Sequence, residues 1–94
     1  MYTWNVTYHC KPGHRETLYQ AICDLGFREH TLKEDGNLKY DYYFSAANPD
    51  DLLLIETWRD AASQDAHCST EIFQKLLALK EEHLDSTTID KFDH

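Results

Sequence analysis

Residues 34–67 read EDGNLKYDYYFSAANPDDLLLIETWRDAASQDAH, and the rest of the chain is organised around this segment. It opens with a turn signal that contains Gly36, and the alternation from Leu38 to Phe44 then predicts an aromatic strand. Asn48-Pro49-Asp50 predicts a second turn, because proline presets its own φ and the polar side chains bond to the nearby backbone. Residues 52–58 are nearly all apolar and predict a central strand, which should form a hairpin with the first strand.

A helix is expected after the hairpin. Asp60 is placed to cap a helix that begins at Ala61, and Ser69 or Thr70 offers a second start after His67. Residues 72–80 then form a wide apolar helix face. Residues 87–92 have the composition of a final strand.

Two further elements precede the segment. Residues 2–10 alternate between apolar and polar side chains, which predicts a strand with one buried face. Residues 14–25 carry apolar side chains three and four apart, which predicts an amphipathic helix that ends at Gly26. Residues 27–33 fit either a short helix or an extended linker.

The order β-α-β-β-α-β predicts an α+β, ferredoxin-like domain, in which a four-stranded antiparallel sheet carries its helices on one face. At 94 residues the chain is long enough for one core only, so we expect a single domain over residues 2–92 and a short tail at 93–94. Aromatic residues occur on both sides of the strand at 38–44, which favours pairing of the uncovered sheet face with a second copy.

The charge balance narrows the classes of partner. The chain has 17 acidic and 9 basic residues and a formal net charge of -8, with no basic stripe. Nucleic acid and anionic membranes are therefore not expected partners. No apolar run reaches the ~20 residues of a membrane-spanning helix, and the N-terminal residues do not resemble a secretory signal. We expect a soluble, cytoplasmic protein.

Neither cysteines nor histidines suggest a metal site. The three cysteines, Cys10, Cys23 and Cys68, lack the spacing of a zinc site and are expected to be free thiols in a reducing compartment. His67 and Glu71 are four residues apart and share a helix face, but no other histidine has the spacing to complete a ligand set.

Four motifs carry a resemblance to a known family: KPG at 11–13, EDGNLKYDYYFS at 34–45, LLLIETWRD at 52–60 and AASQDAH at 61–67. Together, over Tyr2 to Phe92, they resemble the antibiotic biosynthesis monooxygenase domain family, small dimeric α+β barrels that include quinol monooxygenases. The resemblance implies a homodimer whose two sheets face each other, with a pocket between each sheet and its helices. In the members that are oxygenases, it also implies oxidation of phenols or quinols by O2 without metal, flavin or other cofactor.

The resemblance also assigns positions. Gly36, Asn37 and Tyr40 fall on the family's turn and strand motif. Glu56 and Trp58 fall on its E-x-W motif, and His67 falls on its helix histidine. Many relatives carry a second histidine five residues later, where this chain has Ile72, and the haem-degrading branch carries its iron ligand where this chain has Leu77, so haem is not expected.

His67 is the candidate catalytic base, since an imidazole near its usual pKa of ~6.5 can accept a phenolic proton. Asn37 is the candidate donor to the resulting anion, although it equally suits the turn. Tyr40, Trp58 and Phe73 are candidate walls of a substrate pocket. Glu56 is a candidate substrate-binding residue, but a solvent-facing position paired with Arg59 or Lys39 is slightly favoured, because a buried carboxylate is costly.

Three functions fit these residues. The first is a cofactor-independent monooxygenase that oxidises a small aromatic or quinol with O2. The alternative is a non-oxidative ligand-binding or isomerase-like domain of the same fold, and the third is a structural dimerisation module. An enclosed apolar cavity beside His67 favours the first, a polar or collapsed one favours the second, and no cavity favours the third.

Overall fold

The computed structural model describes all 94 residues, which fold in the order β-α-α-β-β-α-α-β. The four strands are β1 (Tyr2–Cys10), β2 (Asn37–Phe44), β3 (Asp51–Trp58) and β4 (Leu84–Asp93). The four helices are α1 (Arg15–Asp24), α2 (Phe27–Leu32), α3 (Ala61–His67) and α4 (Glu71–His83).

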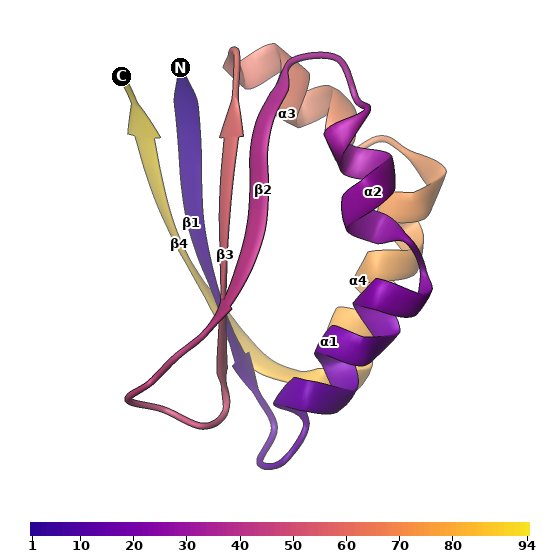
Figure 1. Cartoon of the computed structure of the whole chain (residues 1–94), viewed down its shortest axis with the longest axis vertical. Coiled ribbons are helices and arrows are strands. Elements are labelled where there is room, and N and C mark those ends of the chain that lie inside the picture. The colour runs from indigo at the N-terminus through magenta and orange to yellow at the C-terminus, as the bar shows by residue number, and fades with distance from the viewer.

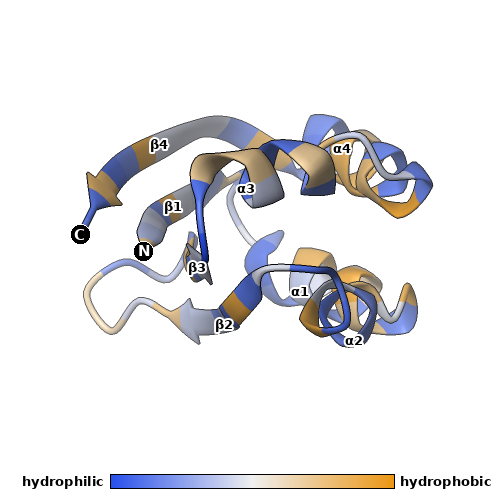
Figure 2. Cartoon of the chain, turned by 90° about the horizontal axis from the view of Figure 1, so that it is seen from above, coloured by the Kyte–Doolittle hydropathy of each residue, from blue (hydrophilic) through white to orange (hydrophobic).

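The strands form one antiparallel sheet in the order β2-β3-β1-β4, with all four helices on one side of it (Figures 1 and 2). This is the predicted ferredoxin-like fold, and the hairpin between β2 and β3 is confirmed. Each helical crossover is made of two helices. The ambiguous residues 27–33 contain α2, and β4 begins three residues earlier than expected, directly after α4.

Local sequence explains where the helices break. Gly26 has φ 67°, a left-handed conformation that ends α1 and that glycine adopts at low cost. Asp60 caps α3 by accepting a hydrogen bond from the Ser63 amide, as predicted. Thr70, one of the two predicted restart residues, caps α4 by accepting from the Phe73 amide.

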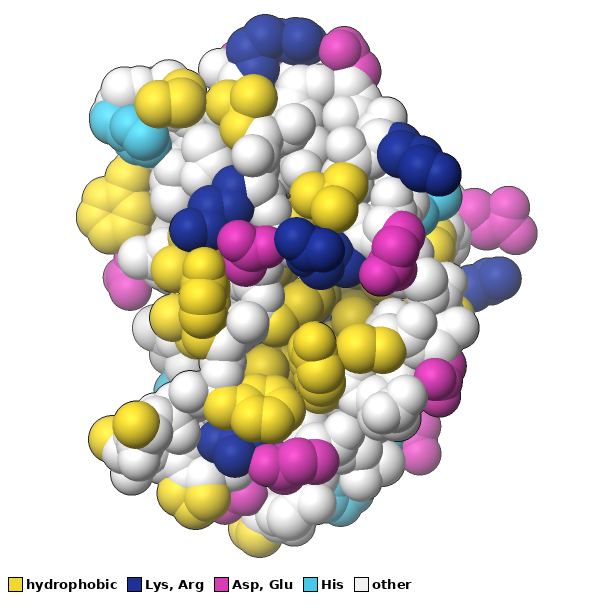
Figure 3. All heavy atoms as spheres, in the orientation of Figure 1, with side chains coloured by type: hydrophobic (Ala, Val, Ile, Leu, Met, Phe, Trp, Pro, Cys, Tyr) yellow, Lys and Arg dark blue, Asp and Glu magenta, His cyan; other side chains and the backbone are white.

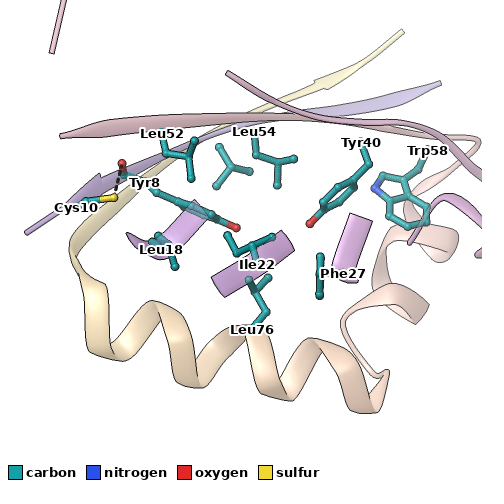
Figure 4. Packing of buried hydrophobic residues seen from close by; sticks show 11 residues of the cluster. Tyr8, Cys10, Leu18, Ile22, Phe27, Tyr40, Leu52, Leu54, Trp58 and Leu76 are labelled. Atoms are coloured by element: carbon teal, nitrogen blue, oxygen red, sulfur yellow. Dashed lines mark hydrogen bonds between the residues drawn. The ribbon is translucent and has the colours of Figure 1, made fainter. Parts of the chain in front are cut away.

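Strand register puts the even-numbered residues of β1 and β3 on the helix-covered face. In β3 every even-numbered residue is buried and every odd-numbered one is only half-buried, so this strand is one-sided, although its sequence is nearly all apolar. Figure 4 shows the core between sheet and helices, where Tyr8 and Tyr40 direct their hydroxyl ends toward each other. The buried apolar residues are Val6, Tyr8, Cys10, Leu18, Ile22, Phe27, Tyr40, Leu52, Leu54, Trp58 and Leu76.

The opposite face of the sheet carries no helix, as the view from above makes clear (Figure 2). Leu53 and Ile55 of β3 lie on it half-buried, and Tyr43 and Phe92 from the two edge strands are exposed. The four helices are too short or too polar to span a lipid bilayer.

Candidate active site

A small cavity of about 50 Å³ lies between the sheet and the helices. Three residues predicted to bind substrate, Tyr40, Glu56 and Phe73, line it. Its walls come from all four strands, from α3 and α4, and from the link between these helices. The lining residues are Trp4, Val6, Tyr8, Tyr40, Glu56, Gln64, Cys68, Phe73, Lys80 and Ile89.

Glu56 is the acidic group of this cavity. Its even position on β3 turns it toward the helices, and only 4% of it is exposed. The Trp58 indole Nε1–H donates a hydrogen bond of 2.9 Å to its Oε1. Burial raises the pKa of Glu56 to about 7, against the lowering effects of Trp58 and Gln64. The favoured solvent-facing position was therefore wrong: the strand's alternation places this carboxylate inside, and Arg59 pairs with Asp35 instead.

Lys80 brings a positive charge to the same cavity. Its Nζ lies 5.1 Å from the centroid of the Tyr8 ring, a cation–π distance. Burial lowers the pKa of Lys80, while the charge of Glu56 raises it. The cavity therefore holds an acid and an amine whose pKa values both move toward neutrality, in otherwise mainly apolar walls.

His67 is enclosed next to this cavity, with only 1% of its surface exposed. Its ring centroid lies 5.0 Å from that of Trp58 and 5.2 Å from that of Phe73. Phe27 and Tyr40 complete the surrounding rings at 5.6 and 5.5 Å. Because Tyr40 and Phe73 also line the cavity, His67 is separated from it by one layer of aromatic side chains.

Hydrogen bonding makes the two nitrogens of His67 unequal. Nδ1 lies 2.8 Å from Oε1 of Glu34, whereas Nε2 is buried and has no partner. Burial lowers the pKa of His67, and the Glu34 carboxylate partly offsets this effect. A carboxylate only accepts, so the neutral imidazole carries its proton on Nδ1 and presents a free lone pair at Nε2.

The remaining predicted residues lie beside the cavity. Trp58 holds Glu56 and packs against His67, but it does not line the cavity. Asn37 pairs with Trp58 across the hairpin and donates from Nδ2 to the Lys39 carbonyl at 3.2 Å, while its buried Oδ1 has no partner. Asn37 does not line the cavity either, and its catalytic role stays a prediction.

Four residues of the cavity and of its surroundings were not predicted. Glu34 lies in the motif at 34–45 and Gln64 in the motif at 61–67, but neither was assigned a role. The spacing of Tyr8 and Lys80 placed them on the apolar faces of a strand and a helix. That position could have identified them as residues of the cavity wall. In the chain as a whole, no three histidine, cysteine or acidic side chains lie close enough together to hold a metal ion.

Known proteins resemble this chain in sequence and in fold. The sequence model of the family described as "Antibiotic biosynthesis monooxygenase" matches residues 1–79. A Bacillus subtilis protein named "Putative monooxygenase YcnE" is 30% identical over 74 residues, which cover 79% of this chain and 76% of that protein.

Solved structures share the fold over nearly the whole chain. A crystal structure of an antibiotic biosynthesis monooxygenase has a TM-score of 0.85 and 28% identity, covering 100% of this chain and 98% of its own. The protein PA3566 from Pseudomonas aeruginosa has a TM-score of 0.87 and 29% identity, covering 99% of this chain and 92% of its own.

Proposed function

Because the chain belongs to the antibiotic biosynthesis monooxygenase family, we propose that it oxidises a small electron-rich aromatic or quinol with O2. The reaction needs no added reductant, since a hydroquinone and O2 give a hydroxyquinone and water. One oxygen atom replaces a ring hydrogen and the other leaves as water, and the substrate supplies all four electrons. In this proposal the protein binds the substrate and moves its protons without metal or flavin.

The unpaired Nε2 of His67 is the observation that carries the proposal. A buried polar atom without a partner is rare in a native protein and indicates a bound water or a functional role. Glu34 holds the opposite nitrogen, so the free lone pair has a fixed direction. An imidazole in this state can accept the hydroxyl proton of a substrate that reaches it past the rings of Tyr40 and Phe73, which produces the electron-rich anion that reacts with O2.

The cavity beside His67 supplies the binding groups. Tyr40 and Phe73 offer aromatic surface, and Glu56, with a pKa of about 7, can donate or accept a hydrogen bond at neutral pH. Lys80 would stabilise an anion that forms in the same space.

Oxygen uptake with a panel of quinols and anthrones tests this function. His67→Gln should lower the rate by at least ~100-fold, the usual contribution of a positioned base. His94→Gln, which changes an exposed terminal histidine, is the matched control and should leave the rate unchanged. Equal rates for His67→Gln and the wild-type protein across the panel would refute the assignment of the base.

The non-oxidative alternative remains a second candidate, because the cavity beside His67 is only about 50 Å³ and contains an acid and an amine, Glu56 and Lys80, which is the collapsed or polar character expected for that function. Such a pair suits proton transfer between neighbouring carbons of a metabolite, as in an isomerase. The oxygen dependence of turnover separates the two candidates: conversion that proceeds equally under argon supports the isomerase, and conversion that needs O2 supports the monooxygenase.

We also propose that two copies pair through the open sheet face to form a dimeric α+β barrel. The support is the apolar surface of Leu53, Ile55, Tyr43 and Phe92 on a face that no helix covers. In sedimentation velocity, the wild-type protein should run as a dimer at micromolar concentration and Ile55→Asp as a monomer. Gln20→Asp on the exposed side of α1 should remain dimeric. A wild-type monomer would contradict the pairing.

A further inference from the structure

The cavity is too small for the proposed substrate as it stands. Its volume is about 50 Å³, whereas a protein cavity that holds benzene has a volume of about 150 Å³. Room for an aromatic ring must therefore come from an adjacent space, opened by the movement of a side chain.

Such a space exists on the face where β2, α1 and α2 lie in front. Figure 3 shows this face hollowed at its centre, with hydrophobic side chains on the floor and charged side chains at the rim. The hollow has a volume of about 310 Å³, which is in the range of ~300–1,000 Å³ typical of small-molecule pockets. Its lining residues are Tyr19, Ile22, Cys23, Arg28, Glu29, Asp41, Tyr42 and Tyr43.

Tyr42 stands between the hollow and the cavity. Its ring centroid lies 5.9 Å from that of Tyr19, which lines the hollow. On its other side the centroid of Tyr40, which lines the cavity, is 5.8 Å away. Both contacts are edge-to-face, so the rings of Tyr42 and Tyr40 lie side by side between the hollow and the cavity.

The Tyr42 hydroxyl is only weakly anchored. It is buried beside the hydroxyl of Tyr40, which influences it, but the two make no hydrogen bond of regular geometry. The backbone next to Tyr42 is hydrogen-bonded to α2. Arg28 donates to the Tyr40 carbonyl at 2.7 Å and to Asp41 Oδ1 at 2.8 Å, which ties α2 to β2 at the rim.

From this geometry we propose that the hollow and the cavity are two parts of one binding site for a planar, uncharged, hydroxylated aromatic molecule, with Tyr42 as the gate between them. This inference rests on the proposed function only for the statement that the bound ligand is oxidised. Binding of the ligand at this site does not depend on it. When Tyr42 turns aside, the aromatic rings of the hollow contact the faces of the ligand and the freed hydroxyl can bond to a ligand oxygen.

The rim of the hollow disfavours an anionic ligand group at this end of the site. Arg28 is already paired with Asp41, and Glu29 adds a negative charge, so a carboxylated or phosphorylated ligand finds no free cation there. An uncharged phenol or quinol meets no such penalty, because its ring lies over an apolar floor and its hydroxyls meet Tyr42 and Glu56.

Cys23 makes the gate testable, since it lines the hollow and is the exposed one of the three free cysteines. Burial raises the pKa of Cys10 to about 11 and also raises that of Cys68, which slows their alkylation. N-ethylmaleimide should therefore modify Cys23 first, as mass spectrometry can verify, and fill the hollow. Cys23→Ser treated with the same reagent is the matched control.

The probe is 2-naphthol, a planar phenol, and the readout is NMR. We expect nuclear Overhauser effects from bound 2-naphthol both to Tyr19 in the hollow and to Trp4 in the cavity. Alkylation of Cys23 should abolish the effects at Trp4, and the treated Cys23→Ser protein should keep them. Contacts at Trp4 that survive alkylation of Cys23, contacts confined to either space, or no binding at millimolar 2-naphthol would overturn the proposal.

Two variants separate the gate from the function. Tyr42→Phe keeps the ring and should weaken 2-naphthol binding by about two- to tenfold, the value of one hydrogen bond, whereas Tyr42→Ala should speed entry into the cavity. If the NMR contacts and the Tyr42 variants behave as expected but no quinol gives O2 uptake, the proposed monooxygenase activity is refuted and the gate is supported. O2 uptake that is unchanged by alkylation of Cys23 would refute the gate and leave the monooxygenase standing.

Discussion

The indole of Trp58 donates its Nε1–H to the carboxylate of Glu56 at 2.9 Å inside the core, two positions along the same strand. Residues two apart on a strand point to the same face, so the E-x-W spacing is what brings this donor to this acceptor. The bond stabilises the charged form of Glu56, yet burial outweighs it and raises the pKa to about 7.

Glu56 should make the stability of the protein depend on pH in a defined window. The pKa is about 7 in the folded state and 4.5 for the free side chain. Because the pKa of Glu56 is raised on folding, protonated Glu56 stabilises the folded state. This contribution is fully present below pH 4.5 and is lost as the pH rises through 7. The free energy of unfolding, measured by urea denaturation, should therefore fall by about 3 kcal/mol more in wild-type protein than in Glu56→Gln between pH 4.5 and 8.

The comparison needs a control for the other carboxylates. Glu81→Gln removes an exposed carboxylate from α4, and its plot of unfolding free energy against pH should run parallel to that of the wild-type protein. A Glu56→Gln curve that also runs parallel to the wild-type curve would mean that Glu56 is not desolvated.

Glu34 should control the basicity of His67. Burial lowers the pKa of His67, and the hydrogen bond and charge of Glu34 are the influences that raise it. Glu34→Gln removes that charge, so an NMR titration should find the pKa of His67 lower still. Because burial lowers the pKa of His67, this histidine contributes stability that is present above pH ~6.5 and is lost as the pH falls through its pKa in the folded state. In Glu34→Gln this loss should be complete only at a lower pH than in wild-type protein.

A neighbouring acid provides the control for that titration. Asp35 is exposed and pairs with Arg59 rather than with His67, so Asp35→Asn should leave the His67 titration in place. A pKa of His67 that rises in Glu34→Gln, or that moves equally in both variants, would contradict the assigned pairing.

Sequence alone predicts the features of this fold that depend on local periodicity. Alternation in residues 2–10 and 38–44 identified two strands. Asp60 was recognised as a cap, and Thr70 as one of two candidates for the next cap, because capping depends on a few neighbouring residues. Glu56 resisted prediction because its burial depends on which phase of an apolar strand faces the helices. Only the packed structure settles that phase.

Long-range pairs explain the rest of what sequence missed. Glu34 and His67 are 33 residues apart, and no spacing rule connects a turn acid with the last residue of a helix. The small volume of the cavity and the position of Tyr42 beside it likewise follow from how large aromatic side chains pack together. Such packing depends on the arrangement of several elements at once.

Gly36 should be the least replaceable glycine of the chain. It has φ 84°, and an added Cβ would lie 2.3 Å from Oγ and 2.6 Å from Cβ of Ser63. Ser63 has little freedom to yield, because its amide and hydroxyl both donate to Asp60 Oδ1, at 2.8 and 2.7 Å. Gly36→Ala therefore combines an unfavourable backbone with a clash against the start of α3.

Gly13→Ala measures the backbone cost without the clash. Its φ is 80°, but nothing lies within 4 Å of an added Cβ. Gly13→Ala should lower the free energy of unfolding by about 1–2 kcal/mol, the cost of a left-handed alanine, and Gly36→Ala by roughly 1–3 kcal/mol more through overpacking. In urea denaturation, adding Ser63→Gly to Gly36→Ala should recover part of that excess, because it removes the clashing side chain, although it also removes the Ser63 hydroxyl bond to Asp60. Equal costs for the two alanine variants would show that α3 is free to move away from this turn.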